Sequence, residues 1–233
     1  MEKNNDLMEL GNRQGLEMFG SLSSEEQAMV LGKIRPFVTL LMQYRCAIRE
    51  IETKLNVLND EFSLEHERNP FESIKSRVKE PVSIIEKMKR KGYELTVENV
   101  EEKLNDVAGI RVICSFVEDI YYLAEMLTAQ DDLEVLQVKD YIKNPKENGY
   151  RSLHLIVQIP IFLSNQKKNM KVEVQFRTIA MDFWASLDHK LKYKKNVKNP
   201  ELIVAELKKC ADVISGVDVR MQEIRNMMEE GEL

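Results

Sequence analysis

The sequence has few cysteines and no surplus of positive charge. Three cysteines occur among 233 residues and none belongs to a C-x-x-C pair, so neither a disulfide framework nor a structural zinc site is indicated. The formal net charge of -5 argues against a general nucleic-acid coat, because binding to a phosphate backbone normally needs a basic surface. Any phosphate chemistry must therefore use local positive patches.

Segments that direct a chain to a membrane are also missing. No apolar run reaches the roughly 18 residues that span a bilayer, and the acidic, polar N-terminus lacks the basic and apolar regions of a signal peptide. We therefore expect a cytoplasmic protein that binds neither membrane nor DNA, and the sequence does not point to single-stranded RNA as a partner. The length suits one catalytic domain with helical extensions.

Near both ends of the chain, apolar residues recur at alternating steps of three and four. This spacing predicts a long amphipathic helix from Ser24 to before Asn69, with Pro36 at a first turn or a kink, and a second helix after Pro200. The seams are Leu41, Tyr44, Ile48, Ile51, Leu55, Leu58 and Phe62, and then Ile203, Leu207, Cys210, Ile214, Val217, Met221, Ile224 and Met228. Each seam packs either on the central domain or on another subunit.

The middle of the chain has the pattern of a mixed α/β (α+β) domain. Helices are expected over 81–91, 96–104 and 178–193 and between the first two strands, and strands over 107–116, 133–139, 151–159 and 170–177, the last two forming a hairpin. This organisation divides the chain into an N-terminal helical extension (1–69), a catalytic domain (70–195) and a C-terminal amphipathic helix (196–233).

Positive charge is concentrated between Ser73 and Gly92, although the chain as a whole is acidic. On the helix predicted there, Ser83, Lys87 and Arg90 share one face. A triphosphate suits this wall, because Arg and Lys neutralise phosphate oxygens. A merely solvated helix face has the same composition. The cations of the segment are Lys75, Arg77, Lys79, Lys87, Lys89, Arg90 and Lys91.

A carboxylate and a guanidinium bracket a glycine at the start of the first predicted strand. Strict alternation would place Asp106 and Arg111 on opposite faces, so we expect Gly109 to mark a bulge or a close backbone approach that brings them together. Asp106 at a strand edge suits a Mg²⁺ ligand. The alternative for Asp106 is an ordinary turn residue.

Two further strands carry polar stripes. After a turn over 145–149, alternation delivers Tyr150, Ser152 and His154 to one face, where a ring, a hydroxyl and an imidazole suit a nucleotide. A buried core histidine is the alternative for His154. Over 171–177 the polar residues point one way and the apolar ones into the core. If the two strands share a sheet, their stripes line one cleft and Glu173 lies within reach of Asp106, as metal-assisted transfer requires.

Taken together, four sequence blocks resemble the synthetase domain of RelA/SpoT-type enzymes, and in particular the RelP-like small alarmone synthetases. The blocks are R-V-K at 77–79, D-V-A-G-I-R at 106–111, K-D-Y-I-K-N-P-K-E-N-G-Y-R-S-L-H at 139–154, and E-V-Q-F-R-T at 173–178 followed by D-F-W-A-S-L-D-H-K at 182–190. The resemblance implies a nucleotidyltransferase-like mixed sheet with flanking helices. It also implies synthesis of (p)ppGpp in the stringent response, by transfer of pyrophosphate from ATP to the 3′-hydroxyl of GDP or GTP with release of AMP.

The resemblance further implies a role for individual residues. Asp106 resembles the Mg²⁺ ligand, and Glu173 resembles the carboxylate that assists Mg²⁺ and activates the acceptor hydroxyl. The positions that match the ATP site are Arg77, Lys79, Ser83, Lys87, Arg90 and Arg111. Those that match the GDP/GTP site are Lys139, Lys146, Tyr150, His154 and Gln175.

Two departures from the larger relatives bear on activity. Gln137 stands where bifunctional enzymes often have Arg before Lys139-Asp140, which leaves GDP and GTP both open as acceptors. The His-Asp motif of the family's hydrolase domain is absent, so we expect synthesis only. The resemblance to small alarmone synthetases also implies a homotetramer built through terminal helices. It therefore favours the subunit-interface alternative for both seams.

Two other functions compete with this interpretation. One is a catalytically inactive regulator that binds nucleotide or RNA on the same fold, against which the intact Asp106, Glu173 and Tyr150 argue. The other is a nucleotidyltransferase acting on tRNA or a protein hydroxyl. The usual signature of that class, Gly-Ser followed by an Asp-x-Asp pair, is missing from the sequence.

Overall fold

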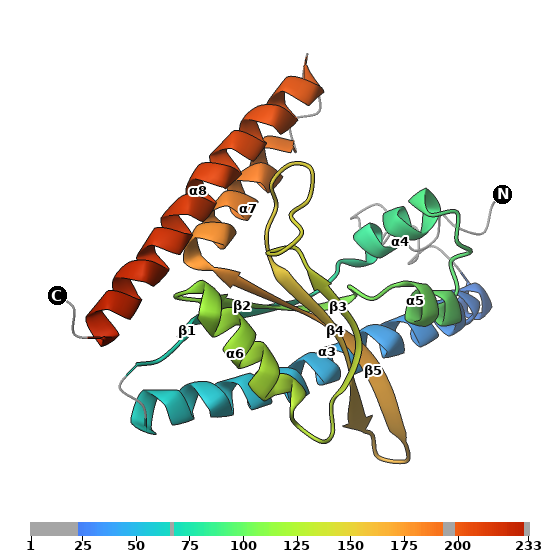
Figure 1. The fold of residues 1–233 in the computed structure, drawn as a ribbon. Coiled ribbons are helices and arrows are strands. Elements are labelled where there is room, and N and C mark those ends of the chain that lie inside the picture. The colour runs from blue at the N-terminus through green and yellow to red at the C-terminus, as the bar shows by residue number, and fades with distance from the viewer. Residues whose placement is uncertain (1–22, 66–67, 193–198, 231–233) are drawn as a thin grey trace.

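Five strands form one mixed sheet in the order β1-β2-β5-β4-β3 (Figure 1). The computed structural model describes residues 23–65, 68–192 and 199–230. The β2 and β5 strands run parallel, and all other neighbouring pairs are antiparallel. The strands are β1 (Phe71–Val78), β2 (Ala108–Cys114), β3 (Glu134–Asp140), β4 (Leu153–Phe162) and β5 (Lys167–Thr178). The expected α/β class with a mixed sheet and flanking helices is confirmed.

Six helices flank the sheet in the described part of the chain: α3 (Ser24–Glu65), α4 (Pro81–Arg90), α5 (Val97–Lys103), α6 (Val117–Thr128), α7 (Ile179–Lys192) and α8 (Pro200–Glu229). Their ends follow the expected signals. The Thr96 hydroxyl accepts a hydrogen bond of 3.1 Å from the Asn99 amide and caps α5. Gly92, with a φ of 71°, follows the end of α4 in the left-handed region that ends many helices.

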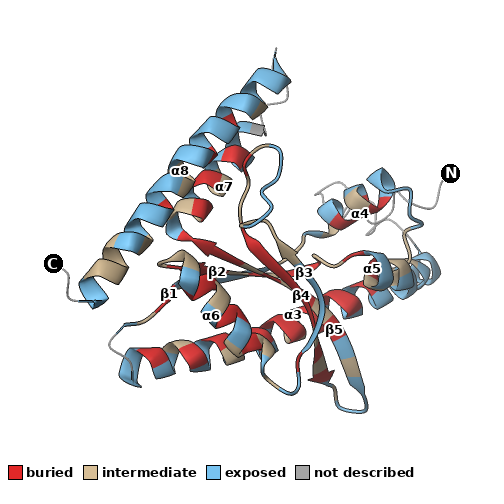
Figure 2. Cartoon of the chain, viewed as in Figure 1, coloured by how far each residue is buried: buried red, intermediate tan, exposed pale blue. Residues whose placement is uncertain are grey.

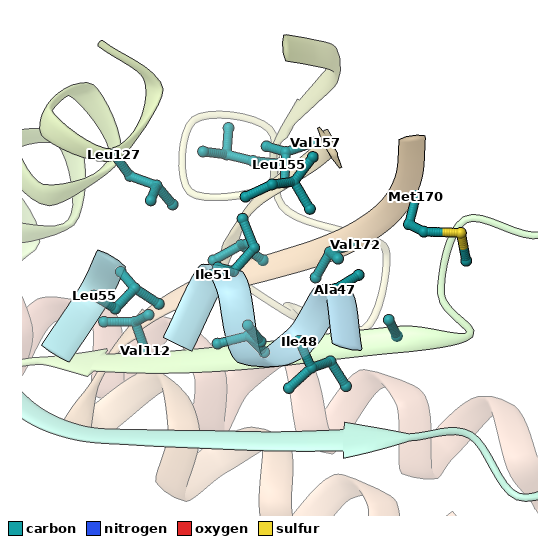
Figure 3. Close-up of a cluster of buried hydrophobic side chains, with 14 of the residues drawn as sticks. Ala47, Ile48, Ile51, Leu55, Val112, Leu127, Leu155, Val157, Met170 and Val172 are labelled. Atoms are coloured by element: carbon teal, nitrogen blue, oxygen red, sulfur yellow. The ribbon is translucent and has the colours of Figure 1, made fainter. Parts of the chain in front are cut away.

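The main hydrophobic core lies between α3 and one face of the sheet. Figure 3 shows Ile51 and Leu55 of α3 among side chains of β2, β4 and β5, with Leu127 of α6 nearby. Every residue of the predicted α3 seam is buried, so this seam packs on the central domain and the subunit-interface alternative is wrong for it. Pro36, expected at a first turn or a kink, lies well inside α3.

The C-terminal helix α8 is bound differently, and most of its surface is exposed (Figure 2). It packs against α7 and α6, and its buried Asp218 accepts a hydrogen bond of 2.5 Å from Thr178 at the end of β5. Of its predicted seam residues, all of which are described, Leu207 alone is buried, whereas Val217 is 54% and Met228 66% exposed. The α8 seam therefore leaves apolar surface unpacked within this chain.

The sequence pattern does not predict the edge strand β1, most of which lies in the basic segment between Ser73 and Gly92. Most of its side chains are polar and only Phe71 is buried, so the alternation that marks a strand is lost. The expected β4–β5 hairpin is confirmed, but β5 begins at Lys167, inside the segment expected to be a loop. The predicted domain boundary at 195 lies outside the described residues.

The bulge expected at Gly109 is wrong. Pairing continues without a register shift on both sides of this residue, opposite Arg77 in β1 and Glu173 in β5. An added Cβ at Gly109 would meet only an ordinary contact, 3.9 Å from the Arg77 carbonyl oxygen. Asp106 precedes the strand, so strand alternation does not govern its direction.

No helix among residues 23–65, 68–192 and 199–230 is both long enough and apolar enough to cross a membrane.

The core position of α3 generates a stability prediction. Replacing fully buried Ile51 by Ala should lower the free energy of unfolding by about 2–5 kcal/mol, because it removes apolar contacts and leaves a cavity under the sheet. Val57→Ala, at an exposed position of the same helix, should change it by less than about 0.5 kcal/mol. Urea titrations followed by circular dichroism measure both variants. Equal losses would contradict the packing of α3 on the sheet.

Candidate active site

A pocket of about 1180 Å³ opens over the sheet face opposite α3. On β5, Glu173 and Gln175 point into it, whereas the alternating Val172 and Val174 lie in the core below. The expected shared cleft is thus confirmed, with α7 and the loop before β4 forming its other walls. The predicted site residues that line it are Arg77, Asp106, Arg111, Lys146, Tyr150, His154, Glu173 and Gln175.

Two carboxylates face this pocket, Glu173 from β5 and Asp106 from the residues just before β2. Glu173 pairs in register with Gly109, three residues beyond Asp106, and the Asp106 charge acts to raise the pKa of Glu173. Asp106 itself accepts a hydrogen bond of 2.6 Å from Lys87, and Lys79 lies 3.1 Å from the same oxygen. Burial would raise the pKa of Asp106, but these two cations outweigh it and lower the pKa. Asp106 is therefore ionised at neutral pH.

Glu173 is held through both of its carboxylate oxygens. The His154 Nδ1 lies 3.3 Å from Oε1, and Gln175 donates to Oε2 at 2.7 Å. Burial would raise the pKa of Glu173, but the contact with His154 and the hydrogen bond from Gln175 outweigh it and lower the pKa. His154 is 7% exposed and both of its ring nitrogens have partners, as in a buried, satisfied histidine, but it also lines the pocket. Its role in nucleotide binding stays a prediction.

The carboxylate pair fits a divalent cation that is shared with a substrate. The Oδ1 atom of Asp106 is buried and has no hydrogen-bond partner, and an orphaned carboxylate oxygen beside a second carboxylate suits a hard cation. No group of three or more His, Cys, Asp or Glu side chains in the described residues is placed to hold a metal. Mg²⁺ usually takes one or two protein carboxylates and completes its shell with water and phosphate oxygens, which matches this donor set.

Tyr150 lies at the centre of an aromatic and cationic wall. Its hydroxyl accepts a hydrogen bond of 2.7 Å from Arg177 and lies 2.8 Å from His154 Nε2. The Lys146 ammonium lies 4.8 Å from the centre of the Tyr150 ring. A neutral His154 with its proton on Nδ1 satisfies all these contacts, because Tyr150 then donates to Nε2 and Nδ1 donates to Glu173.

The sequence grouping of Tyr150, Ser152 and His154 on one strand face is partly wrong. The β4 strand begins at Leu153, so Tyr150 and Ser152 precede it. The Ser152 hydroxyl is buried and donates a hydrogen bond of 2.9 Å to the Phe176 carbonyl, where it joins β4 to β5. Ser152 is therefore a structural residue.

Arg177, which lines the pocket, and Asp182, which contacts Arg177 from α7, were not assigned from the sequence. Arg177 is only 5% exposed, and Asp182 Oδ1 accepts hydrogen bonds from both Arg177, at 2.9 Å, and Arg111, at 3.0 Å. A continuous chain of contacts thus joins Arg111 through Asp182, Arg177, Tyr150 and His154 to Glu173. The polar stripe of β5 already contained Arg177, but nothing in the sequence shows that Asp182 on α7 turns back to it.

Other predicted site residues do not line this pocket. Ser83 and Arg90 are exposed on α4. Lys79 and Lys87 reach the pocket only through Asp106, and Lys139 lies on β3 opposite His154 in register. A second hollow of about 320 Å³ shares Arg77, Asp106, Arg111, Glu173 and Gln175 with the pocket and extends to Lys75.

Comparison with known proteins adds independent information about this chain. A family model described as a region found in RelA / SpoT proteins matches residues 76–198. The chain is 46% identical over 185 residues to the GTP pyrophosphokinase YwaC of Bacillus subtilis, covering 79% of this chain and 88% of that protein. It is 38% identical over 192 residues to the GTP pyrophosphokinase YjbM of the same organism, covering 82% and 90%.

Solved structures match the fold as well. The small alarmone synthetase 1 from Bacillus subtilis bound to its product pppGpp superposes with a TM-score of 0.75 and 38% identity, covering 82% of this chain and 96% of that one. The small alarmone synthetase 2 from the same organism superposes with a TM-score of 0.73 and 43% identity, covering 82% and 98%. Sequence and fold therefore agree on the same set of proteins.

The cation pair around Asp106 generates a prediction about its titration. Lys87→Met should raise the pKa of Asp106, because the strongest stabilising contact of the carboxylate is removed while its burial remains. Lys89→Met, at an exposed position on the same helix, is the matched control and should leave this pKa unchanged. Carboxyl-carbon NMR titration follows both. If Asp106 had the same titration midpoint in Lys87→Met and in the parent protein, the described ion pair would be contradicted.

Proposed function

Because the chain belongs to the RelA/SpoT family, we propose that it is a GTP/GDP diphosphokinase that makes (p)ppGpp. It transfers the pyrophosphate of ATP to the 3′-hydroxyl of GDP or GTP and releases AMP. Two curated relatives that it matches along most of their length are named GTP pyrophosphokinases, and one matched structure holds pppGpp. The observation that carries the proposal is the ionised pair of Asp106 and Glu173 between a cationic wall and Tyr150.

The proposed reaction is a displacement at the β-phosphorus of ATP. A bond forms between the acceptor's 3′-oxygen and this phosphorus, the bond from the phosphorus to the α–β bridging oxygen breaks, and AMP leaves with that oxygen. Glu173 is ionised and hydrogen-bonded in place, so it accepts the proton of the 3′-hydroxyl as the new bond forms. Asp106 and Glu173 would hold Mg²⁺, which when bound would supply charge neutralisation for the polyphosphate.

The donor nucleotide is assigned to the side of the pocket formed by β1 and β2, next to Lys87 of α4. Arg77 and Arg111 line the pocket there and suit the adenine ring, because a guanidinium stacks on aromatic planes. Lys79 and Lys87 both contact Asp106, so two positive charges face one negative charge there. The remaining positive charge favours the phosphates of the donor. Ser83 and Arg90, exposed on α4, remain candidates for outer contacts with the phosphates.

The acceptor nucleotide is assigned to the side formed by β4, β5 and the loop before β4. Tyr150 offers a ring for guanine, and base stacking of this kind contributes about 1–3 kcal/mol. Lys146 lies over the same ring, while His154 and Gln175 connect this side to Glu173. Lys139 is a candidate for contact with the acceptor's phosphates, and both GDP and GTP remain acceptors in this proposal.

We also propose a cytoplasmic homotetramer; assembly was expected through both terminal helices, but with the α3 seam buried within the chain it is assigned to the C-terminal helix α8. ATP and guanine nucleotides are intracellular substrates. The exposed apolar residues of α8 support an interface, and α7 adds Phe183 and Leu187. Light scattering should then give about four times the chain mass of 27.2 kDa, and Val217→Asp should lower this mass, because it places a charge in the apolar interface. A monomer mass for the parent protein would contradict the assembly.

The proposed activity is tested by incubating the protein with Mg²⁺, labelled ATP and either GDP or GTP. The expected products are AMP and a 3′-pyrophosphorylated guanine nucleotide. Glu173→Gln should lower kcat by about 10²–10⁴-fold, because the amide accepts no proton, while thermal stability and nucleotide binding are kept. The matched control Glu102→Gln changes an exposed carboxylate on α5 and should leave kcat unaltered. Substantial synthesis by Glu173→Gln would remove Glu173 from its role as base.

A further inference from the structure

The loop that carries Lys146 and Tyr150 rests directly on helix α8. Gly149, in this loop, has a φ of 86° and approaches α8 so closely that an added Cβ would lie 2.4 Å from the Ala211 Cβ and 3.3 Å from the Lys208 Cα. Only glycine fits such a contact without displacing the loop or the helix. The loop and α8 are thus packed so closely that position 149 has no room for one additional methyl group.

Arg151, which follows Tyr150 in the sequence, also joins the loop to α8. Its guanidinium donates to the carbonyls of Gly149, at 3.1 Å, and Ala211, at 3.3 Å. It also donates to the Asp212 carboxylate at 3.2 Å. The Arg151 side chain is only 17% exposed, so these hydrogen bonds are largely shielded from water. One side chain therefore connects the backbone of the loop with the backbone of α8.

Tyr150 itself is backed by a small cluster that is separate from the main core. The cluster comprises Trp184, Leu207 and Ala211, with Tyr150 packed against it. The Trp184 indole N–H donates to the Leu207 carbonyl at 3.0 Å, and the centres of the Trp184 and Tyr150 rings are 6.4 Å apart. Two of the three buried members belong to α8, so α8 forms the back wall of the tyrosine.

The loop has little regular structure of its own to hold this position. Between Lys146 and Tyr150 the backbone makes two internal hydrogen bonds, Gly149 N–H to the Lys146 carbonyl at 2.8 Å and Lys146 N–H to the Tyr150 carbonyl at 3.2 Å. A loop that must be ordered by its ligand loses conformational entropy on binding, whereas a loop docked beforehand does not. Docking on α8 therefore lowers the free-energy cost of placing Tyr150 and Lys146 against a ligand.

We propose that residues 207–212 of α8, with Arg151, are positioning residues for the acceptor nucleotide. They fix the loop and hence the affinity for GDP and GTP, without acting on the donor side. The inference rests on the proposed function for its kinetic readout. If α8 also forms a subunit contact through Val213 and Val217, which are exposed on the same stretch of helix, assembly and acceptor affinity are linked through this segment.

The test uses the full-length protein with Arg151→Met and, separately, Ala211→Val. Each should raise KM for GDP and GTP by about tenfold, the loss expected for one or two hydrogen bonds to a charged group, while KM for ATP and kcat change by less than about twofold. Amide hydrogen exchange over 146–150 should become faster in both variants. Lys209→Met, which removes only an exposed α8 contact with Glu206, is the matched control and should change none of these values.

Thermal melting identifies a variant that has lost its fold. If Ala211→Val fails in this way, the measurements on Arg151→Met, the milder change, decide whether the positioning role holds. A rise in KM for ATP equal to that for GDP would overturn the positioning role, as would unchanged exchange over 146–150. If the parent protein itself releases no AMP, the proposed function fails. Hydrogen exchange and calorimetric GDP binding still test the docking in that case, because neither needs turnover.

Discussion

The parallel pairing of β2 with β5 is the constraint on which the pocket depends. In this register Gly109 lies opposite Glu173 and Arg111 lies opposite Gln175, which sets the end of β2 that carries Asp106 beside Glu173. Because side chains alternate along a strand, a slip of one residue would turn Glu173 into the core and Val174 into the pocket. The apolar residues of β5 that pack under α3 prevent this slip. The core therefore determines the spacing of the polar residues above it.

The polar face is stable because its charges are paired. Two half-buried carboxylates would repel each other and tend to bind protons, but Lys79 and Lys87 surround Asp106, and His154 and Gln175 hold Glu173. On the far side, Asp182 accepts hydrogen bonds from two arginines and offsets part of their mutual repulsion. Each contact also fixes a side chain in one direction. The same interactions that make burial of these groups tolerable thus orient them toward the pocket.

Much of this arrangement was predictable from local patterns. Periods of two and of three to four predicted β2, β4, β5 and the long helices, and alternation correctly placed Glu173 and Gln175 on one face. The errors arose where tertiary contacts override local rules. The edge strand β1 buries too little to show alternation, and Ser152 serves a neighbouring strand in a way that no spacing reveals. The hydrogen bonds from two arginines to Asp182 join separate elements, so only the three-dimensional structure shows them.

The terminal helices show the same limit in another form. Both have apolar residues at the same spacing, and on that evidence they are equivalent. In the structure, α3 is long enough to cross four strands and buries its whole seam, whereas α8 reaches the domain mainly through α7, α6 and the loop at Gly149. The spacing predicts an apolar stripe on each helix, but it does not indicate which surface packs against that stripe. The outward-facing part of the α8 stripe is consequently free for a role between molecules.

The lowered pKa of Glu173 constrains how the proposed transfer can work. A general base is most effective when its pKa lies near the working pH, and Glu173 is held below its usual value by His154 and Gln175. Such a carboxylate is ionised at neutral pH and attracts a proton weakly. It therefore accepts the hydroxyl proton only as the bond to phosphorus forms, when the acceptor oxygen is already acidified. Neutralising and aligning the polyphosphate on the cationic side of the pocket therefore has to lower the barrier together with the base.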